Sequence, residues 1–379
     1  MLATSALSLV ALLVLPAPQP PQKPPPAPPR APFAAFDVPT SHVATSRDDL
    51  SAAIVSMATA HRIDAVKRSV EALPEAGNVA SVALGASGAE YALGLRDGRI
   101  VYVAADGARR EFRVDPKANV LGITWHPGFL AWWTANSRGG VLDLATGKQR
   151  IEPALEVSIC MSWPSMEFTA DGLHVCWRQR SNRPEAAQYI VVQSLATGAE
   201  VARLPVYATM RSGLLVVGNQ VVHSVRAGTA VWHLDAFDTT NGTTRRLDAN
   251  LRGGHFVDLA AAANGRFLVE GDFEEPGVAR YCLDGAGVDH KLLGESAGFL
   301  GCGTLRDGDA AVDTVILRPA RHANELTAVR LDDGNPVRVP LPGIGARAPE
   351  RVGTVLGGAV LWTVLQGKGD RRIEFFALP

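Results

Sequence analysis

The chain has 379 residues, enough for one large domain or for roughly two to three average ones. Its hydrophobic content of 47% supplies a sizeable core, and its formal net charge of -1 gives no reason to expect a nucleic-acid partner. The 37 glycines, set among short apolar runs, favour an all-β chain over a helical one.

The N-terminus has the pattern of a targeting segment. The apolar run Leu2–Leu15 is too short for a membrane-spanning helix and has the length of a signal-peptide core, although no Lys or Arg precedes it. Ten prolines among the seventeen residues of Pro16–Pro32 exclude helix and sheet and favour extended polyproline II. We expect a signal peptide or anchor over residues 1–16, a Pro-rich linker over 17–35, and one domain over 36–379. The protein would then be secreted, periplasmic or part of the cell envelope, with the first segment as a membrane tether if it is not cleaved.

The first stretch of the domain is ambiguous. Ser46 and the acidic residues after it are typical of a helix N-terminus. We therefore expect a short helix within residues 46–60, with a strand as the alternative.

A unit of two strands around a glycine turn then recurs six times. Its turn glycines stand 40, 51, 44, 45 and 47 residues apart: Gly107, Gly147, Gly198, Gly242, Gly287 and Gly334. A second hairpin lies between successive copies, with turns at Ser87–Gly88, Pro127–Gly128, Asp171–Gly172, Gly218–Asn219, Asn264–Gly265, Asp307–Gly308 and Gly357–Gly358. Two hairpins per repeat of this length predict the four strands of a propeller blade.

The repeats predict a single all-β propeller, with seven four-stranded blades as the best count and six or eight as alternatives. The last blade, with hairpin Arg351–Leu365 and strand Arg372–Leu378, is one strand short. We expect an N-terminal strand, within Ile63–Leu73, to complete this blade and close the ring.

Several segments resemble known propeller repeats. Phe168–Trp177 (FTADGLHVCW) and Ala261–Gly271 (AAANGRFLVEG) resemble the hairpins of WD40-like and TolB-like propellers. The ATG turns at Leu144–Lys148 and Leu195–Ala199 resemble quinoprotein-type repeats. The resemblance implies a disc with a central channel that binds a protein or a ligand. The strands lack a Trp-Asp ending and the units lack the docking tryptophan of quinoproteins, so we expect no quinone and no other cofactor.

Four cysteines leave two alternatives. No C-x-x-C pattern occurs, so the spacing does not predict a zinc site. Outside the cytoplasm, disulfides Cys160–Cys176 and Cys282–Cys302 are one interpretation, and four buried thiols are the other.

The sequence contains one match to a catalytic motif. Gly294–Gly298 fits G-x-S-x-G, which makes Ser296 a weak nucleophile candidate, but no helix pattern follows it, as that motif requires. The nine histidines show no close metal-binding spacing, and we expect no metal site. His174 and His223 fall on second strands, where a structural role is the default, whereas His255 and His322 fall in expected loops.

Arginines gather in the loops that join second and third strands. These loops share one face of a propeller, so their guanidinium groups can form a ring suited to carboxylate, sulfate or phosphate groups, or to an acidic protein surface. Solvated loop charge is the alternative interpretation. The candidates are Arg138, Arg178, Arg180, Arg183, Arg226, Arg318, Arg321, His322, Arg371 and Arg372, with Lys117, Arg211 and Arg252 on strand crossings of the same face.

Three function classes compete. An extracytoplasmic binding propeller accounts best for an arginine-rich face, whereas a hydrolase-like or lactonase-like enzyme should converge carboxylates, histidines or a metal on the channel. A structural assembly factor of the envelope is the third class. The sequence favours binding over catalysis, because the expected face has many arginines and few catalytic groups.

Overall fold

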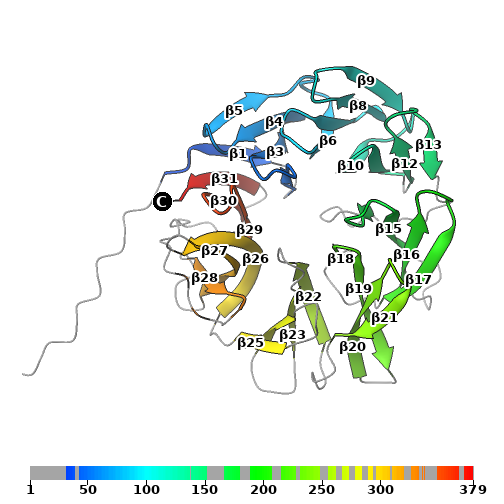
Figure 1. Cartoon of the computed structure of the whole chain (residues 1–379). Coiled ribbons are helices and arrows are strands. Elements are labelled where there is room, and N and C mark those ends of the chain that lie inside the picture. Colours follow the sequence, from blue (N-terminus) through cyan, green and yellow to red (C-terminus); the bar gives the residue numbers. More distant parts are fainter. Residues whose placement is uncertain are drawn as a thin grey trace, which may run out of the picture.

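A computed structural model describes residues 31–38, 42–136, 138–151, 166–179, 188–206, 215–227, 231–247, 255–261, 267–272, 278–283, 289–292, 296–307, 310–319, 326–332, 335, 337, 348–366 and 371–378. In this part of the chain all regular structure is β, and antiparallel sheets follow one another around a ring (Figure 1). None of the described residues forms a helix with the length and apolar character needed to cross a bilayer.

The first four sheets take their strands in chain order. They are β2 (Ala44–Thr45), β3 (Ser51–Ser56), β4 (Thr59–Asp64) and β5 (Ser69–Ala72); β6 (Val79–Leu84), β7 (Tyr91–Leu95), β8 (Arg99–Val103) and β9 (Arg109–Arg113); β10 (Val120–His126), β11 (Phe129–Thr134), β12 (Gly139–Asp143) and β13 (Gln149–Ile151); and β14 (Met166–Phe168), β15 (His174–Gln179), β16 (Gln188–Ser194) and β17 (Glu200–Val206).

The remaining sheets complete the ring. They are β18 (Leu215–Val217), β19 (Gln220–Ala227), β20 (Val231–Asp238) and β21 (Thr243–Arg246); β22 (His255–Ala261), β23 (Phe267–Asp272), β24 (Val278–Leu283) and β25 (Asp289–Leu292); β26 (Ser296–Asp307), β27 (Ala310–Pro319) and β28 (Thr327–Arg330); and β29 (Ala348–Val355), β30 (Val360–Gln366) and β31 (Arg371–Ala377), with β1 (Ala34–Val38) beside β31.

The all-β propeller of four-stranded antiparallel blades, closed by an N-terminal strand, is confirmed. Seven of the sheets have four strands, and β26–β28 form a further sheet with three strands in the described part of the chain. The sheet β2–β5 comes from residues that the sequence analysis gave to a helix and a closing strand.

Each sheet runs from the ring axis to the rim. Within the sheet β2–β5, every residue of β3 is buried and every residue of β5 is exposed. Figure 1 shows β5, β9, β13 and β17 along the rim and β10, β18 and β22 nearer the axis. The core lies between neighbouring sheets: Trp132, 1% exposed, packs with Ile100 and Ala92 of the preceding sheet.

The third-to-fourth strand turns have a common chemistry. In Asp143–Gly147, the glycine takes φ 72° and its N–H donates to the Asp143 carbonyl at 2.8 Å. The Asp143 carboxylate accepts from the N–H groups of Ala145 (3.0 Å) and Thr146 (2.9 Å), which holds the pKa of Asp143 below its usual range. Asp238–Gly242 repeats this arrangement, which explains why the glycine repeat predicted these turns.

The closing strand is Ala34–Val38, and the prediction of Ile63–Leu73 was wrong. β1 pairs with β31 over five residues, from Ala34 opposite Phe375 to Val38 opposite Arg371. Ile63 instead lies in β4, where it is fully buried against β1 and β30. Segments more than 300 residues apart in the sequence therefore pair in one sheet.

The helix expected within residues 46–60 is also corrected. Ser46 caps a turn between β2 and β3: its Oγ accepts from the Ser51 N–H at 3.0 Å and donates to Asp48 at 2.6 Å. The hairpin β3–β4 then turns at Met57 and Ala58, which have φ of 49° and 60°. Both central residues have the positive φ that a type I′ hairpin needs. Neither is a glycine, so the sequence did not indicate this turn.

Candidate functional site

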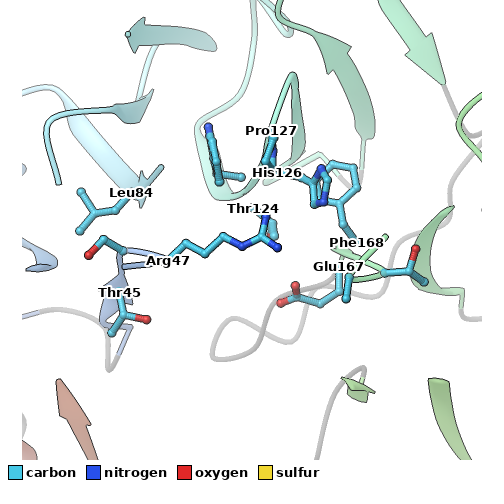
Figure 2. A pocket seen from close by; sticks show the side chains of 12 residues that line it. Thr45, Arg47, Leu84, Thr124, His126, Pro127, Glu167 and Phe168 are labelled. Carbon is cyan, nitrogen blue, oxygen red and sulfur yellow. The ribbon is translucent and has the colours of Figure 1, made fainter. Parts of the chain in front are cut away.

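A pocket of about 320 Å³ lies where the innermost strands of four consecutive sheets end. We call this end of the ring the hairpin-turn face, because the turns joining first to second strands lie there. The lining comes from the ends of β2, β6, β10 and β14 and the turns that follow them (Figure 2). The pocket therefore depends on the relative placement of four blades rather than on one motif.

Arg47 enters the pocket from the turn between β2 and β3. That turn is fixed to the next sheet, because the N–H groups of Arg47 and Asp48 donate to the carbonyls of Gly85 and Ala86, each at 3.1 Å. The Arg47 side chain is exposed and extends across the pocket (Figure 2). It makes no ion pair with any carboxylate in the described part of the chain.

Glu167 enters from the middle of β14. Its neighbours Met166 and Phe168 are buried, whereas the half-buried Glu167 points into the pocket (Figure 2). Withdrawal from water raises the pKa of Glu167 to about 7. Among the described groups none donates a hydrogen bond to its carboxylate.

Aromatic rings form one wall of the pocket. The rings of His126 and Phe168 lie 5.4 Å apart, and a side chain at Gly172 would overlap the His126 ring, so glycine makes room for it. Thr124 Oγ1 donates to the Met166 carbonyl at 2.9 Å and joins β10 to β14. The indole N–H of Trp125 and both ring nitrogens of His126 are buried without a hydrogen-bond partner in the described residues.

The predicted arginine-rich face is the opposite end of the ring. Five of its arginines lie in or beside second-to-third connections of five different sheets. These are Arg138 between β11 and β12, Arg178 near the end of β15, Arg226 near the end of β19, Arg318 near the end of β27 and Arg371 at the start of β31. For Arg178, Arg226 and Arg318 the structure describes only the backbone. Arg180, Arg183, Arg321 and His322, with Arg211 and Arg252, lie outside the described residues.

The described side chains on this face have carboxylate neighbours. Arg138, whose side chain is 56% exposed, lies 3.9 Å from the buried Asp115. Arg371 pairs with Glu350 at 2.8 Å, and Arg372 pairs with Glu374 at 2.9 Å. Arg138 therefore keeps more than half of its side chain open to solvent, whereas Arg371 and Arg372 are more tightly paired.

Ser296 begins β26, and the strand continues to Asp307. A nucleophile elbow requires a helix after the serine, so the backbone here is not that of the motif. His255 begins β22 rather than lying in a loop. Within the described residues, no three His, Cys, Asp or Glu side chains converge as metal ligands would.

Cys176 is a free, buried thiol in the part of the chain that the structure describes, and its pairing with Cys160 stays an untested alternative. Its side chain packs with Ile190, Val192 and Val221 between neighbouring sheets, as in the alternative of buried thiols. Cys160 lies outside the described residues, as do the side chains of Cys282 and Cys302, whose pairing stays a prediction.

The pocket escaped the sequence analysis because its polar residues come from separate repeats. Arg47, His126 and Glu167 share no local pattern. One signal was available: Glu167 is a single charge between two apolar residues, shortly before a recognised hairpin turn.

The sequence matches no family model and no curated protein. The fold is similar to the structure of BamB from Moraxella catarrhalis at 16% identity, with a TM-score of 0.57 and coverage of 92% of this chain and 100% of that one. It is also similar to the Dos1 propeller (12% identity, TM-score 0.56, 91% and 95% covered). A chain in the structure of the mitotic checkpoint complex matches at 12% identity and a TM-score of 0.51, with 99% of each chain covered. By fold, the chain is a β-propeller, similar in architecture to these structures.

Proposed function

We propose that the protein is a binding propeller that works outside the cytoplasm and recognises an acidic protein surface through its second-to-third loop face. The observation that carries this proposal is the position of five arginines in or beside the equivalent connections of five sheets: Arg138, Arg178, Arg226, Arg318 and Arg371. Charges repeated around one face act together on a partner too large to enter the ring.

The chemistry of arginine fits this role. A guanidinium group donates paired hydrogen bonds to carboxylates, and it loses less hydration than an ammonium group when it is covered. The long contact from Arg138 to Asp115, 3.9 Å, leaves the exposed guanidinium free to meet a second carboxylate. The similarity to a chain of the mitotic checkpoint complex supports an interaction role, since that structure is a complex.

We expect the variant R178Q/R226Q/R318Q to bind a fluorescently labelled poly-glutamate peptide at least about tenfold more weakly at about 100 mM salt. Fluorescence anisotropy across a salt series measures this loss. The affinity of the variant should also depend less on salt than that of the wild type, because fewer charge pairs form. The matched control is R109Q/R150Q/R203Q, which removes the same charge from the outermost strands β9, β13 and β17. Equal weakening by both variants would show that only net charge matters and would contradict the proposal.

The location outside the cytoplasm rests on the apolar run Leu2–Leu15 and the proline-rich stretch Pro16–Pro32. In cells that carry a C-terminally tagged chain, we expect the tag to be found outside the cytoplasm. Deletion of residues 2–15 should leave it in the cytoplasm. Cell fractionation with markers for each compartment makes the measurement. A cytoplasmic full-length protein would refute this part of the proposal.

A further inference from the structure

The pocket on the hairpin-turn face contains two ionisable groups of opposite charge without partners in the described part of the chain. Arg47 and Glu167 extend from opposite sides of the pocket, and no ion pair joins them (Figure 2). Each lies on backbone that is held firmly, Arg47 by the bonds of its turn to the next sheet and Glu167 by the innermost strand of its blade. The pocket thus presents to its occupant a cation and a carboxyl group, each carried on backbone that is held in place.

The charge pattern restricts the occupant. A simple anion would pair with Arg47 but would be repelled by the Glu167 carboxylate. A simple cation would pair with Glu167 but would be repelled by Arg47. A molecule with both a carboxylate and an ammonium group satisfies both side chains at once. Its two charges must stand apart, because Arg47 and Glu167 enter the pocket from opposite sides and make no ion pair with each other (Figure 2).

The remaining walls restrict its size and polarity. A volume of about 320 Å³ is at the small end of the range for ligand sites. Leu84, 4% exposed, and the ring of Phe168 offer apolar contact to the body of a ligand. The unmatched hydrogen-bonding atoms of Trp125 and His126 lie in the same wall.

We propose that this pocket binds a short zwitterionic peptide, of dipeptide size with apolar side chains, whose carboxylate pairs with Arg47 and whose amino group pairs with Glu167. The apolar side chains of the peptide pack against Leu84 and Phe168. The site is independent of the arginine-rich face, which lies at the other end of the ring.

Binding and protonation of Glu167 are linked. With its pKa at about 7, Glu167 is largely neutral at lower pH, and a bound ammonium group must displace that proton. Affinity therefore falls as pH drops below about 7, and it falls again above about 8 as the peptide amine loses its own proton. The other charged and titratable groups near β14 whose side chains the structure describes are His126 of β10, Asp171 of the turn that follows β14, His174 and Cys176 of β15, and Arg47 across the pocket.

Isothermal titration calorimetry with the dipeptide Leu-Phe tests the proposal. The two single-charge probes are N-acetyl-Leu-Phe, which lacks the ammonium group, and Leu-Phe amide, which lacks the carboxylate. We expect both to bind the purified protein at least about tenfold more weakly than Leu-Phe. Free phenylalanine is the fourth probe: binding as tight as that of Leu-Phe would identify a single amino acid as the zwitterion.

The variants assign each charge to its side chain. R47Q lacks the partner of the peptide carboxylate, so it should bind Leu-Phe and Leu-Phe amide equally. E167Q lacks the partner of the ammonium group, so it should bind Leu-Phe and N-acetyl-Leu-Phe equally. The loss of affinity at low pH should also disappear in E167Q. R203Q and E200Q are the controls, because this ion pair on β17 lies outside the pocket, and both should bind as the wild type does. Thermal unfolding checks that all variants are folded. The proposal is overturned if the wild type fails to bind Leu-Phe at about 5 mM, or if all the dipeptides bind it equally.

Discussion

Removal of residues 1–38 is expected to destabilise the folded ring by about 4 kcal/mol or more. The truncation deletes β1, with its ladder to β31 and the buried side chains of Ala34 and Val38. It also removes Phe36, whose ring stands edge-on to Phe375 with centroids 6.4 Å apart. The exposed edge of β31 can then pair with another chain, so oligomers should appear. Urea unfolding and size-exclusion chromatography measure the two effects.

The control is a chain that begins at residue 31. It lacks the apolar run and most of the proline-rich stretch but keeps β1, so its unfolding midpoint should match that of the full-length protein. If the truncation to residue 39 is as stable and as monomeric as this control, closure by β1 contributes little to the fold.

The substitution Gly98→Ala is expected to cost about 4 kcal/mol or to prevent folding. Gly98 has φ 79°, which an alanine adopts only with strain, and a Cβ there would lie 1.3 Å from the carbonyl oxygen of Asp115. The backbone cannot move away cheaply, because the Gly98 carbonyl accepts hydrogen bonds from Val114 (3.0 Å) and Asp115 (3.1 Å). Thermal and urea unfolding measure the loss.

The substitution Gly107→Ala separates the cost of the positive φ from the cost of the steric overlap with Asp115. Gly107 has a similar φ of 84°, but nothing lies within 4 Å of its Cβ position. It should therefore lose only about 1 kcal/mol, the cost of the backbone conformation. Equal losses at both positions would show that the close approach to Asp115 does not matter.

The turns were the part of the fold that the sequence predicted well. Gly147, Gly198 and Gly242 all have positive φ between paired strands, because a short polar residue and a glycine suffice to form such turns locally. Once the turns were identified, the flanking apolar segments could be predicted as strands. The regular repetition of these hairpins then predicted the propeller.

The first blade was missed because its local signals were ambiguous. Ser46 and Asp48 satisfy N–H groups in a β-turn as well as they do at a helix start. Ala52 and Ala53 are good helix formers, yet both are completely buried where the sheets pack closely. Tertiary packing decided the conformation there, and no local pattern contains that information.

The sequence could identify functional residues only where they recur. Arginines in equivalent connections are visible as a repeat, so the second-to-third loop face could be proposed from the sequence. Arg47 and Glu167 each occur once, in different blades, and only the closed ring brings them to the same pocket. A site shared between blades leaves no motif along the chain.

The pairing of β1 with β31 also sets the order of events during synthesis. β1 leaves the ribosome long before β31, with which it pairs. The sheets between them can form as they emerge, but the ring stays open until β31 has emerged. An intermediate of this kind exposes an unpaired edge for the whole time of synthesis, and a translation pause before residue 371 would prolong its exposure.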